Sequence, residues 1–336
     1  MTSRRIVVTQ RFFDAAAREL LTSNGCEVVE ASLPAGQADG NLSHAELVEM
    51  LRGAEGWIVG HARVTGELQE ALPDLKVISR RGVGFERVDV AAAERLGKVV
   101  CIAAGGNSDT VAEHAIAMML AVGHRLRETQ ARMQSGDWSI LTGTDLFRKR
   151  VGVVGLGRIG RSLVRRLQGF ECDVAAVAGE SGRTFAAEND VSLLPLEEVL
   201  ERSDYLSVHA PLTDATRLLI DAAALSRMPS SAILINTARG GLVDDRALLD
   251  ALRDGRLAGA GLDVFVSESD ASYASVTEAL IALPNVVASP HSGASTREGL
   301  ARTNMVAAVC ALAVLDGGAP PAECVVVDGR PQAGRA

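Results

Sequence analysis

The feature that most constrains the fold is a group of three glycines that directly follows a short apolar segment. The apolar segment covers residues 151–154, and the glycines are Gly155, Gly157 and Gly160. A continuous apolar run of this length is typical of a buried parallel strand. Apolar residues then recur at helical spacing between 163 and 170, which predicts a helix that opens at the glycines.

Each glycine of this predicted strand–turn–helix unit has its own physical task. Gly155 would permit the tight turn, Gly157 would let the backbone approach a phosphate, and Gly160 would let the helix pack closely on the strand. The N–H groups at the helix start, together with the helix dipole, favour an anion. The pattern could also be a purely structural turn, but its strand and helix context favours a dinucleotide site that includes Arg158 and Ile159.

Three side chains of complementary chemistry stand at the ends of later strand-like segments: Arg239, Glu268 and His291. An arginine can grip a carboxylate with two parallel hydrogen bonds, and a histidine can move a proton. A glutamate can orient that histidine and favour its charged form. Together they are the groups needed to reduce a 2-keto acid. Each also has a structural alternative: a salt bridge for Arg239, a solvated carboxylate for Glu268 and a strand-end support for His291.

Several blocks in the same order resemble the D-isomer-specific 2-hydroxyacid dehydrogenase family, in the style of its phosphoglycerate, glycerate and glyoxylate–hydroxypyruvate reductase-like members. The resemblance runs from about Gly56 to about Ala313. The matching stretches include Arg81–Gly84, Gly106–Ser108, Val208–Thr213, Asn236–Asp244 and Pro290–Thr296. The family's catalytic Arg, Glu and His positions fall on the three residues above. Where the family usually continues with Pro, this chain has Ser269, so the geometry of that loop stays open.

The resemblance also implies binding residues outside the glycine loop. For the cofactor they are His209, Ala210, Pro211, Thr237, Ala238, Asp263 and Gly293. For the substrate they are Arg239, His291 and the backbone N–H groups of Gly82, Val83 and Gly84. Asp263 resembles the family position that bonds the nicotinamide amide, although an aspartate at a strand end can equally cap a turn.

The residues after the second strand of the dinucleotide unit bear on the choice between NAD and NADP. An NAD enzyme usually has Asp or Glu about 20 residues past the glycines, where it bonds the ribose 2′-OH. Here that position falls on Ala178. Ser181 and Arg183 could then bind a 2′-phosphate, whereas Glu180 could reach the ribose and argues for NAD. We therefore predict NADP or NAD, with a slight preference for NADP.

Strand-like and helix-like segments also alternate in the N-terminal part, which has no glycine signature of its own. This pattern predicts an α/β protein with two doubly wound parallel sheets. We expect a flavodoxin-like substrate domain from residues 1–102 and 292–336, with a Rossmann dinucleotide-binding domain, 103–291, inserted in it. Capping-box patterns at Thr110–Glu113 and Ser295–Glu298 predict two helix starts.

Composition argues against several other classes of protein. The net charge is −8 with no basic block, which argues against a nucleic-acid partner. The five cysteines are scattered and lack metal-ligand spacing, so we expect no metal and reduced thiols in the cytoplasm. We expect no signal segment and no membrane association, because the apolar run at 115–122 is far shorter than a membrane span.

The function expected from these features is an NAD(P)-dependent D-2-hydroxyacid dehydrogenase, or 2-keto acid reductase. A small substrate such as glyoxylate or hydroxypyruvate is favoured. Relatives that act on phosphoglycerate often carry Arg-Ser where this chain has His61, and an imidazole is a weaker cation near neutral pH.

Two further expectations stay open on the sequence alone. A dinucleotide-sensing, corepressor-like regulatory protein of the same fold is the alternative function. The segment 125–147 resembles the arm through which relatives form homodimers, although it could be an ordinary surface connection.

Overall fold

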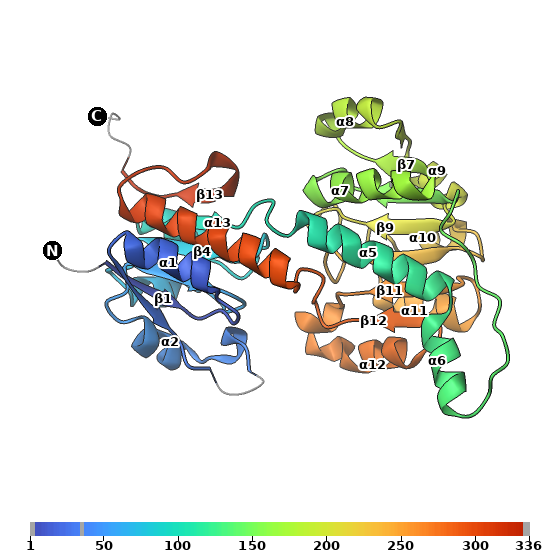
Figure 1. Ribbon diagram of the computed structural model, residues 1–336, viewed down its shortest axis with the longest axis horizontal. Coiled ribbons are helices and arrows are strands. Elements are labelled where there is room, and N and C mark those ends of the chain that lie inside the picture. Colours follow the sequence, from blue (N-terminus) through green and yellow to red (C-terminus); the bar gives the residue numbers. More distant parts are fainter. Residues whose placement is uncertain (1–3, 34–36, 332–336) are drawn as a thin grey trace. The chain divides into compact units, whose positions relative to one another are not determined.

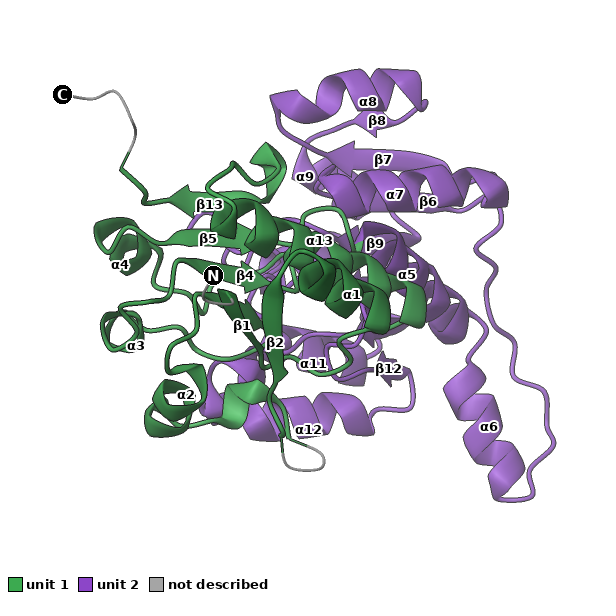
Figure 2. Cartoon of the chain, turned by 60° about the vertical axis from the view of Figure 1, so that its left-hand side comes forward, with its two compact units in different colours: residues 1–107, 296–336 green, residues 108–295 purple. Residues whose placement is uncertain are grey.

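The chain folds into two compact units. The computed structural model describes residues 4–33 and 37–331. Unit 1 comprises Met1–Asn107 with Thr296–Ala336, and unit 2 comprises Ser108–Ser295 (Figure 2). The domain limits expected from the sequence were 102/103 and 291/292, and the unit boundaries lie at 107/108 and 295/296. The assignment of substrate to one unit and dinucleotide to the other stays a prediction.

Unit 1 is built on a six-stranded sheet with the order β13-β5-β4-β3-β1-β2. Its strands are β1 (Arg4–Val8), β2 (Cys26–Glu30), β3 (Gly56–Val59), β4 (Val77–Arg80), β5 (Val99–Ile102) and β13 (Val325–Asp328). All of these pairings are parallel except that of β13, which pairs antiparallel with β5. Without β13 the order is 2-1-3-4-5, which is the flavodoxin-like order.

Helices cover both faces of this sheet because successive side chains of each strand point to opposite faces. Ile6 and Val8 of β1 join one core cluster, whereas Val7 joins the other. The helices are α1 (Ala15–Ser23), α2 (His44–Leu51), α3 (Gly66–Glu70), α4 (Val90–Arg95) and α13 (Arg297–Leu315). Apolar side chains of α1 and α13 pack in the first cluster, and those of α2, α3 and α4 pack in the second. Helices α1 and α13 lie side by side (Figure 1), and α2, α3 and α4 lie on the opposite side of the sheet (Figure 2).

Unit 2 is built on a seven-stranded, fully parallel sheet with the order β12-β11-β10-β9-β6-β7-β8. Its strands are β6 (Arg150–Val154), β7 (Asp173–Val177), β8 (Ser192–Leu193), β9 (Tyr205–Val208), β10 (Ile233–Asn236), β11 (Gly259–Leu262) and β12 (Val286–Ala288). The helices are α5 (Ser108–Gly123), α6 (Leu126–Gln134), α7 (Arg158–Leu167), α8 (Arg183–Glu188), α9 (Leu196–Arg202), α10 (Ala222–Arg227), α11 (Asp245–Arg253) and α12 (Ala274–Ala282). The order of the first six strands is that of a Rossmann sheet, so the predicted fold class is confirmed for both units.

The strand order in each unit marks where a ligand crevice is expected. In open α/β sheets a crevice opens at the carboxyl ends of the two strands from which the chain proceeds in opposite directions. These are β1 and β3 in unit 1, and β6 and β9 in unit 2. The loop with the three glycines leaves β6 at this point.

Both predicted helices form, and α13 begins within two residues of Ser295, but neither predicted capping box caps its helix. Helix α5 already begins at Ser108, so Thr110 and Glu113 lie inside it rather than at its start. The cap of α13 is Thr296, whose side chain accepts a hydrogen bond from the N–H of Gly299 at 3.0 Å. Several polar residues precede each helix, and only the path of the chain decides which of them stands at the first free N–H group.

Helix α13 contains a longer apolar run than the one from which the sequence argued against a membrane span. Residues 305–315 are uninterruptedly apolar, which makes this run longer than the one at 115–122. By length and composition alone the 19-residue helix could cross a membrane. In the structure, Ala307, Cys310 and Ala311 are fully buried in the core of unit 1, as in a core helix of a globular domain.

Candidate active site

The glycine loop joins β6 to α7 in a conformation that needs glycine. Gly155 has φ +104°, and a Cβ there would lie 2.9 Å from the nitrogen of Ala210. A Cβ on Gly160 would lie 2.1 Å from the carbonyl oxygen of Gly155. Gly157 stands at the N-cap of α7, where no side chain caps the helix and nothing lies within 4 Å of a built Cβ. The loop therefore presents N–H groups of the helix start with open space beside Gly157, which fits the pyrophosphate of a dinucleotide.

Two buried polar atoms lie after the neighbouring strands β9 and β10. Within residues 4–33 and 37–331, neither Nδ1 of His209 nor Oγ1 of Thr237 has a hydrogen-bond partner. His209 as a residue is half-buried, and its Nε2 lies 2.8 Å from Oγ of Ser207. Burial lowers the pKa of His209 to about 4, so the ring is neutral near pH 7. Buried polar groups normally find partners, so these two atoms fit a site completed by a bound polar molecule.

Glu268 and His291 are in direct contact. Glu268 ends the 3-10 turn η4 (Val266–Glu268) after β11, and His291 follows β12. Nδ1 of His291 lies 2.7 Å from Oε2 of Glu268, and both side chains are about two-fifths exposed, at 41% and 38%. Oε1 of Glu268 accepts a bond from the N–H of Phe265 at 2.9 Å. Burial works to raise the pKa of Glu268, but these two bonds outweigh it and the pKa is lowered.

The backbone of His291 is in the left-handed region, with φ +52°. This is an uncommon conformation for a residue with a side chain. Its N–H is held by the carbonyl oxygens of Asp263 at 2.8 Å and Ser289 at 3.1 Å. The strained turn is thus fixed by the neighbouring strand end, and it directs the imidazole at Glu268.

Arg239 stands in a turn after β10 that packs against the loop of Glu268. The side chain of Asn236 bonds the carbonyl oxygen of Arg239 at 3.1 Å and the N–H of Ala238 at 3.1 Å. A Cβ on Gly240 would lie 2.2 Å from the carbonyl oxygen of Phe265. Glycine at 240 therefore lets the two turns touch. The sequence analysis did not single out Asn236, although its place at the end of a buried strand was a usable signal.

Asp263 is buried and ties together the turn that carries His291. Its Oδ1 accepts bonds from Oγ of Ser289 at 2.5 Å and from the N–H of Ser292 at 2.8 Å. Its Oδ2 accepts a bond from the N–H of Gly293 at 2.8 Å. Burial works to raise its pKa, but His114, whose Nε2 lies 3.6 Å from Oδ1 of Asp263, and these bonds outweigh it, so the pKa is lowered. The contacts are those of the turn-capping alternative, and a bond to a cofactor stays a proposal.

The segment that bears on cofactor choice follows β7. Glu180 and Arg183, which argued for opposite cofactors, pair with each other, with Nε of Arg183 3.0 Å from Oε2 of Glu180. Arg161 bonds the carbonyl oxygens of Ser181 at 2.6 Å and Leu156 at 2.9 Å. Sequence reasoning missed Arg161, because its partner lies 20 residues further along the chain.

The remaining predicted substrate residues belong to unit 1. Gly82, Val83 and Gly84 follow β4 and are half-buried. The carbonyl oxygen of Gly82 accepts a bond from the N–H of Ala103 at 3.0 Å, which joins the loop to the end of β5. Arg239, Glu268 and His291 all lie in unit 2.

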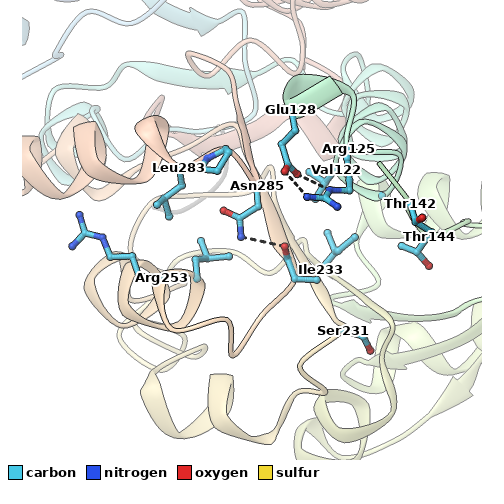
Figure 3. Close-up of a pocket in the computed structure, with 15 residues that line it drawn as sticks. Val122, Arg125, Glu128, Thr142, Thr144, Ser231, Ile233, Arg253, Leu283 and Asn285 are labelled. Carbon is cyan, nitrogen blue, oxygen red and sulfur yellow. Dashed lines mark hydrogen bonds and ion pairs between the residues drawn. The ribbon is translucent and has the colours of Figure 1, made fainter. Parts of the chain in front are cut away.

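A cavity lies at the amino ends of the unit 2 strands. It has a volume of about 700 Å³ and is bordered by residues that precede β10, β11 and β12 (Figure 3). Its polar lining includes Arg125, Glu128, Thr142, Thr144, Arg253 and Asn285. The predicted catalytic side chains follow these same strands, so the cavity is separate from them.

No group of three or more His, Cys, Asp or Glu side chains is arranged to hold a metal ion in the part of the chain that the structure describes. The expectation that no metal takes part stays a prediction from the sequence.

Comparison with known proteins identifies relatives over most of the chain. The sequence profile described as D-isomer specific 2-hydroxyacid dehydrogenase, NAD binding domain, matches residues 116–293, more than half of the 336 residues. D-3-phosphoglycerate dehydrogenase of Mycobacterium leprae (strain TN) is 40% identical over 268 residues, which are 79% of this chain and 50% of that protein. The enzyme of the same name from Rattus norvegicus is 36% identical over 302 residues, 89% of this chain and 54% of that one.

Solved structures match nearly the whole chain. The TT0316 protein from Thermus thermophilus has a TM-score of 0.83 and 35% identity, covering 96% of this chain and 100% of that one. Apo D-lactate dehydrogenase from Escherichia coli has a TM-score of 0.82 and 26% identity, covering 96% and 99%. The chain spans about half the length of the curated relatives it matches.

Proposed function

Because the chain belongs to the D-isomer-specific 2-hydroxyacid dehydrogenase family, we propose that it is an NAD(P)-dependent reductase of a small 2-keto acid, and in reverse a D-2-hydroxyacid dehydrogenase. One observation carries this proposal: the 2.7 Å contact between His291 and Glu268 beside the Arg239 turn. These residues follow strands of the same sheet whose β6–α7 loop carries the three glycines.

In the proposed mechanism a bound dinucleotide supplies or accepts the hydride. Gly155, Gly157 and Gly160, with Arg158 and Ile159, would hold its pyrophosphate at the start of α7. The partnerless atoms of His209 and Thr237, with Ala210, Pro211, Ala238, Asp263 and Gly293, would contact the rest of it.

The chain's own residues would then bind the substrate and move a proton. Arg239 would grip the carboxylate of the 2-keto acid, with the N–H groups of residues 82–84 as a further binding element. Since Nδ1 of His291 bonds Glu268, its Nε2 is the nitrogen that would donate a proton to the carbonyl oxygen. Glu268 would hold the ring in one orientation.

We propose a short, unphosphorylated substrate such as glyoxylate or hydroxypyruvate. His61 stands where phosphate-binding relatives often carry Arg-Ser, and its N–H donates to Asp39 at 2.6 Å. A phosphorylated 2-keto acid is the second candidate, because the curated relatives at 40% and 36% identity are D-3-phosphoglycerate dehydrogenases.

We also propose a slight preference for NADP over NAD. Ala178 lacks the carboxylate that would exclude a 2′-phosphate, and Ser181, Arg183 and Arg161 lie around this segment. A kcat/KM ratio that favours NADH about tenfold, or about 1.4 kcal/mol, would contradict this preference.

A second copy of the chain is the proposed partner of the segment 125–147. Helix α6 buries no side chain, and Trp138 and Ile140 are 75% and 93% exposed. Residues 142–144 of this segment also line the 700 Å³ cavity. Light scattering should give the mass of a dimer, and Trp138→Ser with Ile140→Ser should shift it toward the monomer.

Free thiols at all five cysteines fit the proposed cytoplasmic setting.

The test of the function is a matrix of 2-keto acids against NADH and NADPH. Glyoxylate, hydroxypyruvate, pyruvate, a branched 2-keto acid and phosphohydroxypyruvate span the substrate sizes. We expect turnover that falls roughly 1,000-fold in His291→Ala while nucleotide affinity changes little, since the general acid is lost. Tight nucleotide binding and nucleotide-dependent assembly without turnover would favour the corepressor-like alternative.

A further inference from the structure

Asp245 is a buried carboxylate that the mechanism above does not use. It lies in the first turn of α11 and is 3% exposed. The helix does not need it as a cap, because Asp244 accepts the N–H groups of Arg246 at 3.0 Å and Ala247 at 3.2 Å. Instead, Oδ2 of Asp245 accepts a bond from the N–H of Val266 at 3.0 Å, in the turn that carries Glu268.

The peptide between Phe265 and Val266 is the point where the parts of the candidate active site meet. Two carboxylates hold successive N–H groups there: Glu268 bonds that of Phe265, and Asp245 bonds that of Val266. On its other side, the carbonyl oxygen of Phe265 lies against Gly240, with no room for a Cβ. A shift of this peptide would therefore move both Glu268 and the Arg239 turn.

We propose that Asp245 is a positioning residue that acts through Glu268. Its carboxylate fixes the peptide at 265–266, which keeps Glu268 in register with His291 and with the turn of Arg239. This inference rests on the proposed function, because register between these groups matters only if they act on one substrate.

The charge of Asp245 makes this support depend on pH. Burial raises the pKa of Asp245 to about 6, against the opposing bond from Val266, and the negative charges of Asp244 and Glu268 add to the rise. Two helices, α10 and α12, pack against α11. Their charged residues are Asp221 and Arg227 at the two ends of α10 and Glu278 on α12. None of these three is among the groups that shift Asp245.

Protonation of Asp245 should weaken its support of the turn. A neutral carboxyl group is a poorer acceptor than a carboxylate, so the bond to Val266 weakens as the pH falls through about 6. Turnover should then have an acid limb near this pH that comes from a residue outside direct reach of the substrate.

The first test needs no turnover. In the full-length wild-type protein, the carboxyl ¹³C shift of Asp245 and the amide ¹H–¹⁵N shift of Val266 should titrate together, with a midpoint near 6. In Glu268→Gln the midpoint should fall, because a neighbouring negative charge is removed. A Val266 amide that does not follow Asp245, or a midpoint unchanged in Glu268→Gln, would overturn the proposal.

The second test compares Asp245→Asn with Asp250→Asn, an exposed carboxylate on the same helix. Asp245→Asn keeps the size and an acceptor but loses the charge. It should lower kcat about tenfold, leave nucleotide affinity within about twofold and abolish the acid limb, since misplacement acts on the chemical step. Asp250→Asn should match the wild type.

Thermal unfolding separates positioning from a merely structural role. At pH 7.5 the Tm of Asp245→Asn should equal or exceed that of the wild type, because a buried charge is removed. A lower Tm together with an intact acid limb would mean that Asp245 only supports the fold. If the wild type turns over none of the keto acids, the proposed function fails, while the titration of Val266 still shows whether Asp245 holds the peptide at 265–266. The titration of Val266 in the wild type gives the same information if the Asp245→Asn variant does not fold.

Discussion

The crevices of the two sheets lie at the same point of the strand order, but one is filled by a carboxylate of the chain and the other carries the glycine loop. In unit 1, the point between β1 and β3 is occupied by Asp39, which is 2% exposed. Its carboxylate accepts bonds from Oγ1 of Thr9 at 2.8 Å and from the N–H groups of Gly60 at 2.8 Å and His61 at 2.6 Å. In unit 2, the corresponding point between β6 and β9 carries the glycine loop, and α7 begins there without a side-chain cap.

The difference shows how one sheet architecture can serve two purposes. Strand ends with N–H groups that point outward attract an anion in either sheet. Unit 1 provides that anion from its own chain, so the crevice contributes to stability. Unit 2 leaves the helix start to a ligand, and small residues keep the approach open. The comparison predicts that substitutions in the crevice of unit 1 change unfolding, whereas those in the crevice of unit 2 change dinucleotide binding.

The largest effect is expected from Gly160→Ala in unit 2. The new Cβ would meet the backbone oxygen of Gly155 at 2.1 Å, so the loop must move. A displacement that costs about 3 kcal/mol corresponds to roughly 100-fold weaker dinucleotide binding, measurable by calorimetry. Gly169→Ala is the control, since nothing lies within 4 Å of its Cβ. Unchanged affinity in Gly160→Ala would break the comparison.

Asp39→Ala should produce the opposite pattern in unit 1. Removal of this carboxylate leaves the donors at 9, 60 and 61 without their acceptor, which should cost about 3 kcal/mol of unfolding free energy. Urea unfolding measures this loss, and dinucleotide affinity should stay within about twofold of the wild type because the glycine loop is untouched. The exposed Asp74→Ala is the control. Equal losses of affinity in Asp39→Ala and Gly160→Ala would mean that the two crevices are not independent.

Asp245→Asn extends the comparison to a second buried carboxylate. Asp245 accepts one hydrogen bond, from the backbone, whereas Asp39 accepts three hydrogen bonds. Since the folded-state pKa, about 6, lies above the ordinary value of 3.8, the folded protein binds the proton more tightly. The contribution of Asp245 to wild-type stability therefore falls as the pH rises between these values and stays lower above pH 6. The variant should be more stable than the wild type by about 3 kcal/mol at pH 7.5 and equal to it near pH 3.5. Denaturant unfolding at both pH values checks the sign.

The smallest effect is expected from Glu180→Gln. The change removes the exposed partner of Arg183, which becomes available to a 2′-phosphate. The ratio of kcat/KM for NADPH to that for NADH should rise about threefold, the size expected of an exposed ion pair. Glu188→Gln, at the exposed end of α8, should leave the ratio unchanged. A fall in the ratio would show that Glu180 itself favours NADPH.

Local sequence patterns predicted much of the fold. The apolar run before Gly155 and the helical spacing after it are properties of neighbouring residues, and β6 and α7 form there. The antiparallel strand β13 was not predicted, because its pairing with β5 joins segments more than 200 residues apart. The two helix caps failed for a related reason, since the capping residue depends on where the chain enters the helix.

The sequence by itself determined the alternation of strands and helices, the glycine loop and the placement of Arg239, Glu268 and His291 after successive strands. These features depend on residue type and spacing, which are local. Only the tertiary structure decided the partners: Glu268 on His291, Asp39 in the first crevice and Asp245 behind Glu268. Each of these contacts depends on the positions of separate turns or strand ends. Those positions are set by how the strands order and pack, which residue type alone does not specify.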